Sequence, residues 1–146
     1  MNQTIKDFVA SKRIAVVGVS KSDAKFGNSI YRELKEKGYD LVPIHPSMDV
    51  FDNDQCFPTI HEVQPPVEAV LINVKKDKVK SILDDAHQAG VTKVWLQQGS
   101  ETPETIEYGK SLGMKIVPGG CIMMYAEPVK SVHSFHRWLW KLIKKY

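Results

Sequence analysis

The chain has 146 residues, of which 42% are hydrophobic and 25% are charged, and these values suit one domain with a single core. No apolar run approaches the roughly 20 residues that span a bilayer, and the first residues, MNQTIKDFVASKR, lack the apolar centre of a signal peptide. We therefore expect a cytoplasmic protein without a membrane partner, whose cysteines, Cys56 and Cys121, are free thiols.

The net charge of +3 is unevenly distributed. Residues 130–146 contain five basic residues and no acidic residue, so the rest of the chain carries −2, the difference between +3 and +5. A main body that is not basic argues against a nucleic-acid-binding domain. The sequence has no Cys/His cluster with the spacing of a zinc site, and we expect no metal.

In the first half of the chain, apolar runs alternate with amphipathic ones. Ile14–Val19 has the continuous apolar pattern of a buried strand, Gly27–Lys37 has helical spacing, and Leu41–Ile44 is the next strand. Pro43 lies inside that strand and cannot donate a ladder hydrogen bond, so a bulge or irregular pairing is expected there. A short extra strand is expected at Val50–Phe51.

The same alternation continues in the second half. Ala69–Val74, Lys93–Gln97 and Met114–Val117 are predicted strands. Asp77–Ala89 has the apolar spacing of an amphipathic helix, and a second helix, ending at Leu112, begins at the N-cap Thr102 with a proline in its first position.

Strands that alternate with helices imply parallel pairing through right-handed crossovers. We predict one α/β domain over residues 1–146, with its core at about 12–121: an open, five-stranded parallel sheet of Rossmann type with helices on both faces. Residues 129–145 predict a further helix with one apolar and one basic face. We expect this C-terminal helix to dock on the sheet; the alternatives are a homodimer or protein contact, or an anionic membrane surface.

In open parallel sheets, ligands bind beyond the carboxyl ends of the strands. The first strand leads through glycines and lysines into a helix N-terminus, which favours an anion, and Lys75 and Lys76 follow the third strand. The residues alone therefore predict a phosphorylated ligand. NAD is disfavoured, because Gly18 and Gly27 are nine residues apart and the second strand ends in His45 instead of an acid. A Walker A motif is absent, so ATP hydrolysis by that route is unsupported.

Four segments carry a family resemblance: AVVGVSKSDAKFGNSIYRELKEKGYDLVPIHP, CFPTIHEVQPPVEAVLINVKK, VWLQQGSETPE and CIMMYAEPVKSVHSFHR. Together they resemble the small stand-alone CoA-binding proteins, which are similar to the N-terminal CoA-binding domain of the succinyl-CoA synthetase alpha subunit. The resemblance covers roughly residues 12–137. It implies a Rossmann-like domain that holds coenzyme A.

The resemblance also implies the site. The loop at Val19–Asn28 would hold the pyrophosphate, with Lys25 facing a phosphate. His45 stands where the family commonly has asparagine before the proline. The full set of candidate binding residues is Gly18, Val19, Ser20, Lys25, Phe26, Gly27, Asn28, His45, Pro46, Asn73, Val74, Lys75, Gln97, Gly99 and Cys121.

The expected function is binding of CoA or an acyl-CoA without a catalytic domain, because the synthetase's phosphorylated histidine and nucleotide site lie in parts that 146 residues do not include. No catalytic residue is predicted, since no histidine is spaced with carboxylates as a triad. One alternative is an enzyme that acts on an acyl-CoA or another phosphorylated ligand through Cys121. A second is another nucleotide-binding or interaction module.

Overall fold

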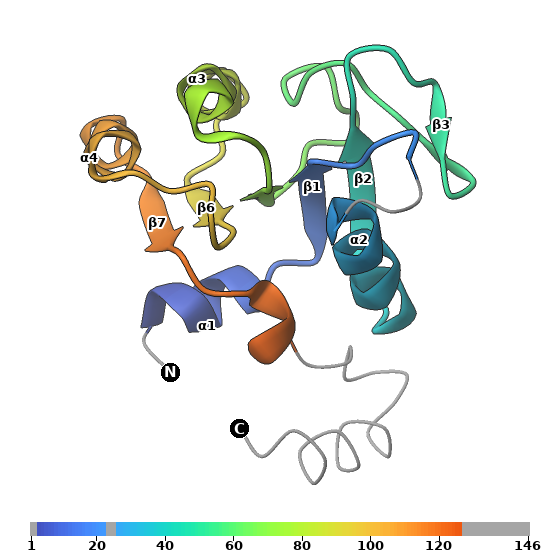
Figure 1. Cartoon of the computed structure of the whole chain (residues 1–146), viewed down its shortest axis with the longest axis horizontal. Coiled ribbons are helices and arrows are strands. Elements are labelled where there is room, and N and C mark those ends of the chain that lie inside the picture. Colours follow the sequence, from blue (N-terminus) through green and yellow to red (C-terminus); the bar gives the residue numbers. More distant parts are fainter. Residues whose placement is uncertain (1–2, 23–25, 127–146) are drawn as a thin grey trace, which may run out of the picture.

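The computed structural model describes residues 3–22 and 26–126. Its main sheet contains β1 (Arg13–Val17), β2 (Asp40–Ile44), β5 (Ala69–Ile72), β6 (Lys93–Leu96) and β7 (Lys115–Pro118), in the order β2-β1-β5-β6-β7. Every neighbouring pair is parallel, which confirms the predicted α/β sheet. The strand order reverses between β1 and β5 (Figure 1), and this is where such sheets open a crevice for ligands.

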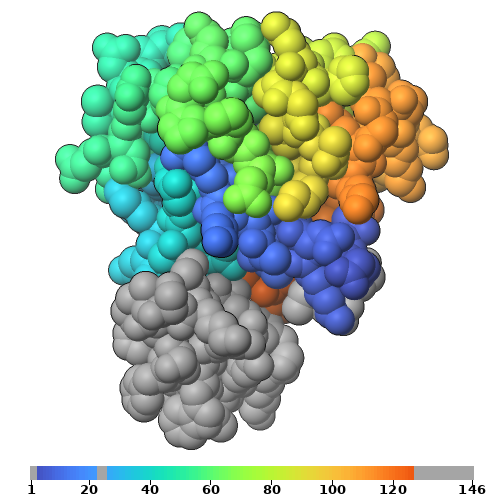
Figure 2. All heavy atoms as spheres, turned by 180° about the vertical axis from the view of Figure 1, so that it is seen from behind, coloured from blue at the N-terminus to red at the C-terminus, as the bar shows by residue number. Residues whose placement is uncertain are grey.

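Helices cover both faces of the sheet, as predicted (Figure 1). One face is covered by α1 (Gln3–Val9), α2 (Phe26–Glu36) and the 3-10 turn η2 (Ile122–Met124). The other is covered by α3 (Val79–Gln88), which follows the turn η1 (Lys76–Lys78), and by α4 (Pro103–Ser111). Seen from behind, α1 (blue) lies below the segment that contains β7 (orange) in Figure 2.

The core has two layers because successive strand residues point to opposite faces. Ile14 and Val16 of β1 pack on the α1–α2 side, and Ala15 and Val17 pack on the α3–α4 side. Trp95 of β6 is fully buried in the first layer. Each strand of the sheet is therefore sandwiched, which explains its continuous apolar run.

Helix α1 was missed by the sequence analysis. Its Ile5, Phe8 and Val9 have the i, i+3, i+4 spacing of a short apolar stripe, and all three pack into the core layer. The ring of Phe8 meets Trp95 edge to face at 5.4 Å. A helix of seven residues is only marginally stable by itself, so α1 depends on this tertiary contact. The apolar spacing in the sequence is correspondingly a weak signal for it.

The prediction of a bulge at Pro43 was wrong. The pairing of β2 with β1 keeps one register from Arg13–Asp40 to Val17–Ile44, with Pro43 opposite Val16. Pro43 turns away from β1, and its carbonyl accepts a hydrogen bond from the Phe57 N–H at 3.1 Å. The missing N–H therefore belongs to the outer edge of β2, where a proline costs no ladder bond with β1.

Phe57 extends the sheet beyond β2. It forms a parallel bridge with Ile44, and its carbonyl accepts from the His45 N–H at 3.0 Å. Counting this bridge as a rudimentary strand, the order matches the 3-2-1-4-5-6 arrangement of Rossmann folds. The segment at 57 thus stands where the third Rossmann strand would lie.

The predicted helices and short strand are confirmed with small changes of boundary. The predicted helix at 77–89 begins as η1 and continues as α3, and Thr102 and Thr105 form a capping box at the start of α4. β3 (Val50–Phe51) pairs with β4 (Asp54–Gln55) in a separate hairpin. The predicted helix at 129–145 lies outside the described residues. Among the helices that are described, none combines the length and hydropathy needed to span a bilayer.

Candidate functional site

Two glycines bring three loops together at the carboxyl ends of β1 and β5. A Cβ on Gly18, whose φ is +140°, would lie 2.3 Å from the Asn73 carbonyl oxygen. A Cβ on Gly27 would lie 2.2 Å from the Gly18 carbonyl oxygen and 3.2 Å from the Asn73 side-chain nitrogen. Neither position can hold a side chain without backbone movement. The glycines therefore let the start of α2 pack directly against the ends of both strands.

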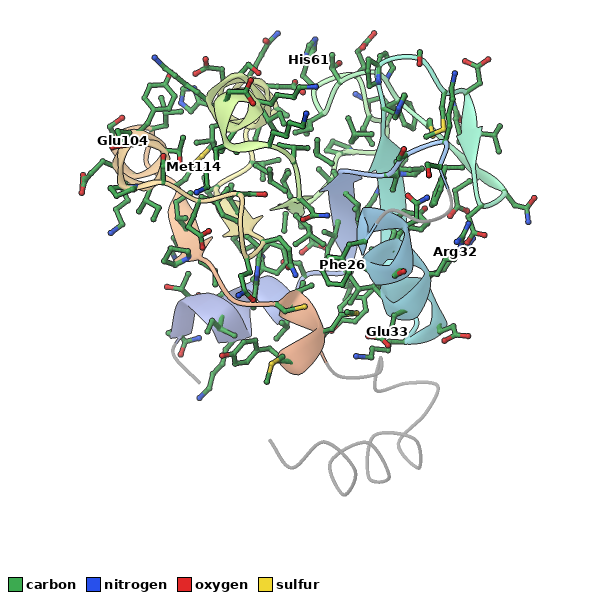
Figure 3. The ribbon with its side chains drawn as sticks, in the orientation of Figure 1. Phe26, Arg32, Glu33, His61, Glu104 and Met114 are labelled. Atoms are coloured by element: carbon green, nitrogen blue, oxygen red, sulfur yellow. The ribbon has the colours of Figure 1, made fainter. Side chains whose placement is uncertain are left out.

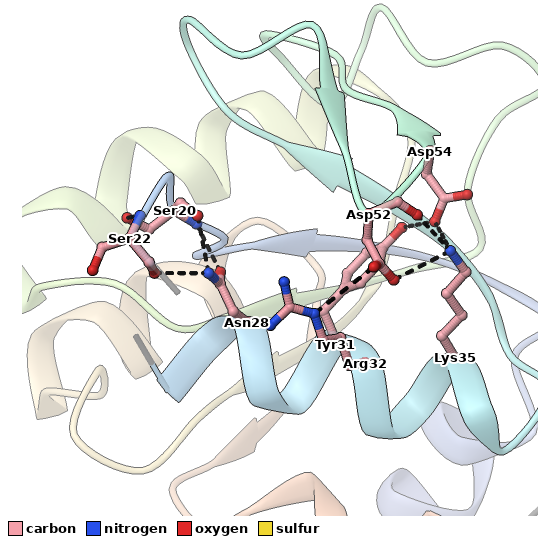
Figure 4. Close-up of polar contacts among 8 residues, drawn as sticks. All are labelled: Ser20, Ser22, Asn28, Tyr31, Arg32, Lys35, Asp52 and Asp54. Carbon is pink, nitrogen blue, oxygen red and sulfur yellow. Dashed lines mark hydrogen bonds and ion pairs between the residues drawn. The ribbon is translucent and has the colours of Figure 1, made fainter. Parts of the chain in front are cut away.

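Asn28 shapes the loop between β1 and α2. Its side chain is fully buried and accepts a hydrogen bond from the Ser20 N–H at 2.8 Å. Its amide donates to the carbonyls of Ser20 and Ser22, both at 2.9 Å (Figure 4). These contacts fold the loop back onto the first turn of the helix. Phe26, at the start of α2, is 53% exposed (Figure 3).

A cavity of about 430 Å³ opens beside this loop, on the α3 side of the sheet. It lies at the carboxyl ends of β1, β2 and β5, beside the point between β1 and β5 where the strand order reverses. Five predicted site residues line it: Gly18, Val19, His45, Pro46 and Val74. The other lining residues are Val17, Ile44, Pro58, Lys78, Ser81, Ile82 and Asp85.

His45 is held in one orientation at the cavity wall. Its Nδ1 accepts hydrogen bonds from the backbone N–H groups of Ser47 and Met48, both at 3.1 Å. In the neutral ring this leaves the proton on Nε2, which makes Nε2 a donor. Burial, together with the positive charge of Lys21, lowers the pKa of His45.

The wall formed by η1 and α3 was missed by the sequence analysis. Lys78, Ser81, Ile82 and Asp85 face the cavity and are spaced i, i+3, i+4, i+7. That spacing places them on one helix face, but it does not by itself show that this face meets a cavity. Lys75 and Lys76 are exposed and are not among the residues that line the cavity, and Lys25 lies outside the described residues.

Asp85 does not offer a free carboxylate to the cavity. One oxygen accepts from the Ile60 N–H at 2.7 Å. The other accepts from the His61 N–H at 3.1 Å and lies 2.7 Å from the His61 Nδ1. The acid is thus occupied in holding the 60–61 turn against α3, and its negative charge is partly neutralised by these donors.

The remaining predicted residues lie on the other face or farther along the edge. Gln97 is buried; its Oε1 accepts from the Ile122 N–H at 3.2 Å, and its Nε2 has no hydrogen-bond partner among the described residues. Gly99, at a φ of +97°, donates its N–H to Glu101 at 2.9 Å. Cys121 is a free, half-buried thiol without a hydrogen bond to any described residue. The structure therefore divides the predicted set between two faces of the sheet.

A clasp of charged groups connects α2 to the β3–β4 hairpin (Figure 4). The Lys35 ammonium lies 3.0 Å from Asp54 and 3.3 Å from Asp52, and the Tyr31 hydroxyl donates to Asp54 at 2.5 Å. Burial and the Asp54 carboxylate raise the pKa of Tyr31 well above its usual range. The clasp holds the segment that follows His45 and Pro46, and it thereby supports one side of the cavity.

No metal site accompanies this cavity within residues 3–22 and 26–126, where no three His, Cys, Asp or Glu side chains gather. The fold and the cavity instead define a Rossmann-like domain with its crevice at the strand-order reversal. Residues 12–127 match the family model described as a CoA binding domain. The chain therefore belongs to this family of CoA-binding domains.

Relatives of similar size share most of the chain. An uncharacterised protein of Bacillus subtilis, YneT, is 23% identical over 112 residues, which cover 77% of this chain and 83% of that protein. A solved structure of a hypothetical protein from Pyrococcus horikoshii superposes with a TM-score of 0.78 at 26% identity, covering 84% of this chain and 87% of that one.

Much longer relatives contain a similar domain. The alpha subunit of an ADP-forming acetate–CoA ligase from Pyrococcus furiosus is 25% identical over 126 residues, which cover 79% of this chain but 28% of the subunit. A Korarchaeum cryptofilum acetyl-coenzyme A synthetase, solved with phosphate and ADP, matches with a TM-score of 0.65 at 31% identity, over 74% of this chain and 25% of that one. The chain therefore spans about a quarter of these enzymes.

Proposed function

We propose that this protein binds CoA or an acyl-CoA at the carboxyl edge of β1, β2 and β5. The observation that carries the proposal is the cavity at the strand-order reversal, in a chain that belongs to a CoA-binding family. The adenosine part of CoA would occupy the cavity, between the apolar walls of Val17, Ile44 and Ile82. A few polar groups among apolar walls are typical of cofactor sites.

The pyrophosphate would lie at the β1–α2 loop. The close packing of Gly18 and Gly27 leaves backbone at the start of α2 instead of side chains, so a phosphate can approach the free N–H groups of the helix end. Asn28 supports this role by fixing the loop from inside. The residues present thus fit a nucleotide with a pyrophosphate.

The proposed role is binding without chemistry by this chain alone. The ligases that contain a similar domain are about four times as long as the part they share with it, so their activity is not transferred here. Within the described residues, no side chain is hydrogen-bonded to the Cys121 thiol to activate it. A cytoplasmic location, and a protein partner or second copy bound through residues 129–145, belong to the same proposal.

Titration calorimetry with CoA, acetyl-CoA, ADP and NAD tests the proposal. Ser81 is exposed on α3 and lines the cavity. Ser81→Trp should therefore fill the cavity and lower the affinity for CoA at least about tenfold. Gln88→Trp, at the exposed end of the same helix, is the matched control and should bind normally. CoA binding no tighter than NAD binding by the unaltered protein would refute the proposal.

A further inference from the structure

Residues 45–61, here called the strap, leave β2 at the cavity and return to it. His45 and Pro46 line the cavity where the strap begins, and Pro58 lines it where the strap comes back. Between these points lies the β3–β4 hairpin, which forms a two-stranded sheet of its own. One continuous piece of chain therefore supplies two separate parts of the cavity wall.

Backbone hydrogen bonds join the two ends of the strap beside the cavity. The His45 N–H donates to the Phe57 carbonyl at 3.0 Å, and the Phe57 N–H donates to the Pro43 carbonyl at 3.1 Å. Closer to the hairpin, the Cys56 N–H donates to the Asp49 carbonyl at 2.9 Å. Because these bonds tie the outgoing and returning chain together, a displacement of the hairpin should move both cavity-lining parts of the strap.

The far end of the strap is fixed to α2 by the clasp (Figure 4). The Lys35 ammonium contacts the carboxylates of Asp52 and Asp54 and donates to the Asp52 carbonyl at 2.7 Å. Without this ammonium the two carboxylates would repel each other at the tip of the hairpin. The Tyr31 hydroxyl supplies a second bond to Asp54. The position of the hairpin on α2 therefore depends on Lys35.

The two ends of the strap are held differently at the cavity. The returning end is fixed to α3, because Asp85 accepts from both N–H groups of the 60–61 turn. The hydrogen bonds of the His45 ring stay inside the strap, where Nδ1 accepts from the Ser47 and Met48 N–H groups. The orientation of His45 at the cavity therefore follows the backbone that leads into the hairpin.

We propose that Lys35 positions the cavity wall for the ligand, although it does not line the cavity. By holding the tip of the strap on α2, Lys35 keeps His45 and Pro58 in the arrangement that accepts adenosine. The coupling is reciprocal, so a ligand in the cavity stabilises the clasp by as much as the clasp strengthens binding. This inference rests on the proposed function for the identity of the ligand, whereas the coupling between clasp and strap is measurable without a ligand.

Substitutions at Lys35 separate its charge from its packing. Lys35→Met keeps a long apolar stem and removes the ammonium, and Lys35→Arg restores a cation of similar reach. Tyr31→Phe removes the hydroxyl bond to Asp54 and is a second way to weaken the clasp. Lys115→Met is the matched control, because Lys115 is an exposed lysine that pairs with Asp7 at 3.9 Å on β7 and does not line the cavity.

Amide hydrogen exchange of the ligand-free protein tests the coupling directly. In Lys35→Met the amides of His45 and Phe57, which join the ends of the strap, should exchange at least about fivefold faster. The Gln97 amide, which donates to the Ile72 carbonyl at 2.9 Å, should keep its protection, and this shows that the variant remains folded. Lys35→Arg should restore slow exchange, and Lys115→Met should not change it.

Titration calorimetry then tests the effect on the ligand. CoA and ADP share the adenosine that would occupy the cavity, so Lys35→Met should lower the affinity for both by the same factor, about fivefold. Tyr31→Phe should act in the same direction, and Lys35→Arg and Lys115→Met should bind normally.

Unchanged CoA affinity in Lys35→Met and Tyr31→Phe overturns the positioning role and leaves the proposed function standing, whatever the exchange rates. Unchanged exchange at His45 and Phe57 overturns the transmission through the strap. Faster exchange in a protein whose unaltered form binds neither CoA nor ADP refutes the proposed function and supports the coupling of clasp and strap.

Discussion

The carboxyl edge of the sheet is built differently at its two ends. At the β2–β1 end, an open cavity is lined by residues that include His45 and Lys78. Toward the β6–β7 end, the fold itself uses the hydroxyl of Ser100, which donates to the Val74 carbonyl at 2.7 Å and accepts from the Val74 N–H at 3.0 Å. Position after a strand therefore does not by itself make a residue a ligand contact.

The two ends should respond to mutation in opposite ways. Changes at the β6–β7 end remove hydrogen bonds that the fold uses, so they should lower stability. A change at an exposed cavity-wall residue such as Lys78 removes no side-chain contact of the described fold, so it should lower ligand affinity instead. The junction of Gly18, Gly27 and Asn73 lies between these regions and should affect both properties.

The largest effect is expected for Gly27→Ala. An alanine inside a helix is ordinarily more stable than glycine by up to about 1 kcal/mol. Here the new Cβ would lie 2.2 Å from the Gly18 carbonyl oxygen, so the helix must move away from the strand. We expect about 3 kcal/mol of destabilisation, measured by urea unfolding, and loss of CoA binding.

Gly90→Ala is the control for Gly27→Ala. Gly90 has a φ of +79°, but its Cβ would meet no atom within 4 Å. Gly90→Ala should lose only roughly 1 kcal/mol of stability, because alanine disfavours the left-handed backbone conformation. The variant should bind CoA normally. If Gly27→Ala proved as stable as the unaltered protein, the close approach of α2 to β1 would be wrong.

Asn28→Ala should have the second largest effect. It removes one acceptor and two donor contacts from a buried side chain that holds the β1–α2 loop. We expect about 2 kcal/mol of destabilisation and weaker CoA binding, because the loop loses its shape. Asn28→Asp keeps the acceptor for the Ser20 N–H and should retain more stability than the alanine variant. Normal CoA affinity in Asn28→Ala would show that the loop shape is unimportant for binding.

Ser100→Ala should separate the two ends of the edge. The hydroxyl connects the loops after β5 and β6 through both backbone groups of Val74. Its loss should cost about 1 kcal/mol in unfolding measurements, while CoA affinity changes less than about threefold. Lys78→Gln should give the reverse pattern, with normal stability and a lower affinity for CoA, because Lys78 is exposed on the cavity wall. A similar response in both variants would remove the distinction between the two ends.

The fold could be predicted from the sequence because its signals are local. Apolar runs such as Ala69–Val74 and the capped helix at Thr102 need no knowledge of their neighbours to be recognised. Pro43 was misinterpreted because its effect depends on which neighbour its N–H faces. Helix α1 was missed because its stability comes from contact with Trp95, far along the chain.

The site could be predicted only in part for a related reason. The carboxyl ends of the strands indicated Gly18, His45 and Val74, which do line the cavity. The opposite wall, with Lys78 and Asp85, comes from the face of α3 that turns toward the sheet edge, and periodicity alone does not say which helix faces a ligand. Whether a polar group is free or already hydrogen-bonded is likewise a tertiary property.

The smallest expected effect is a pH dependence that originates at His45. Burial and Lys21 lower its pKa in the folded protein below the ordinary value of about 6.5, so the unfolded chain binds the proton first as pH falls. Stability from this group is therefore fully present above about pH 6.5 and is lost as pH decreases toward the folded pKa. In His45→Asn that contribution is absent. Urea unfolding between about pH 8 and pH 5 should show the unaltered protein losing more stability than the variant. Parallel pH profiles would mean that His45 is as easily protonated in the folded protein as in the unfolded chain.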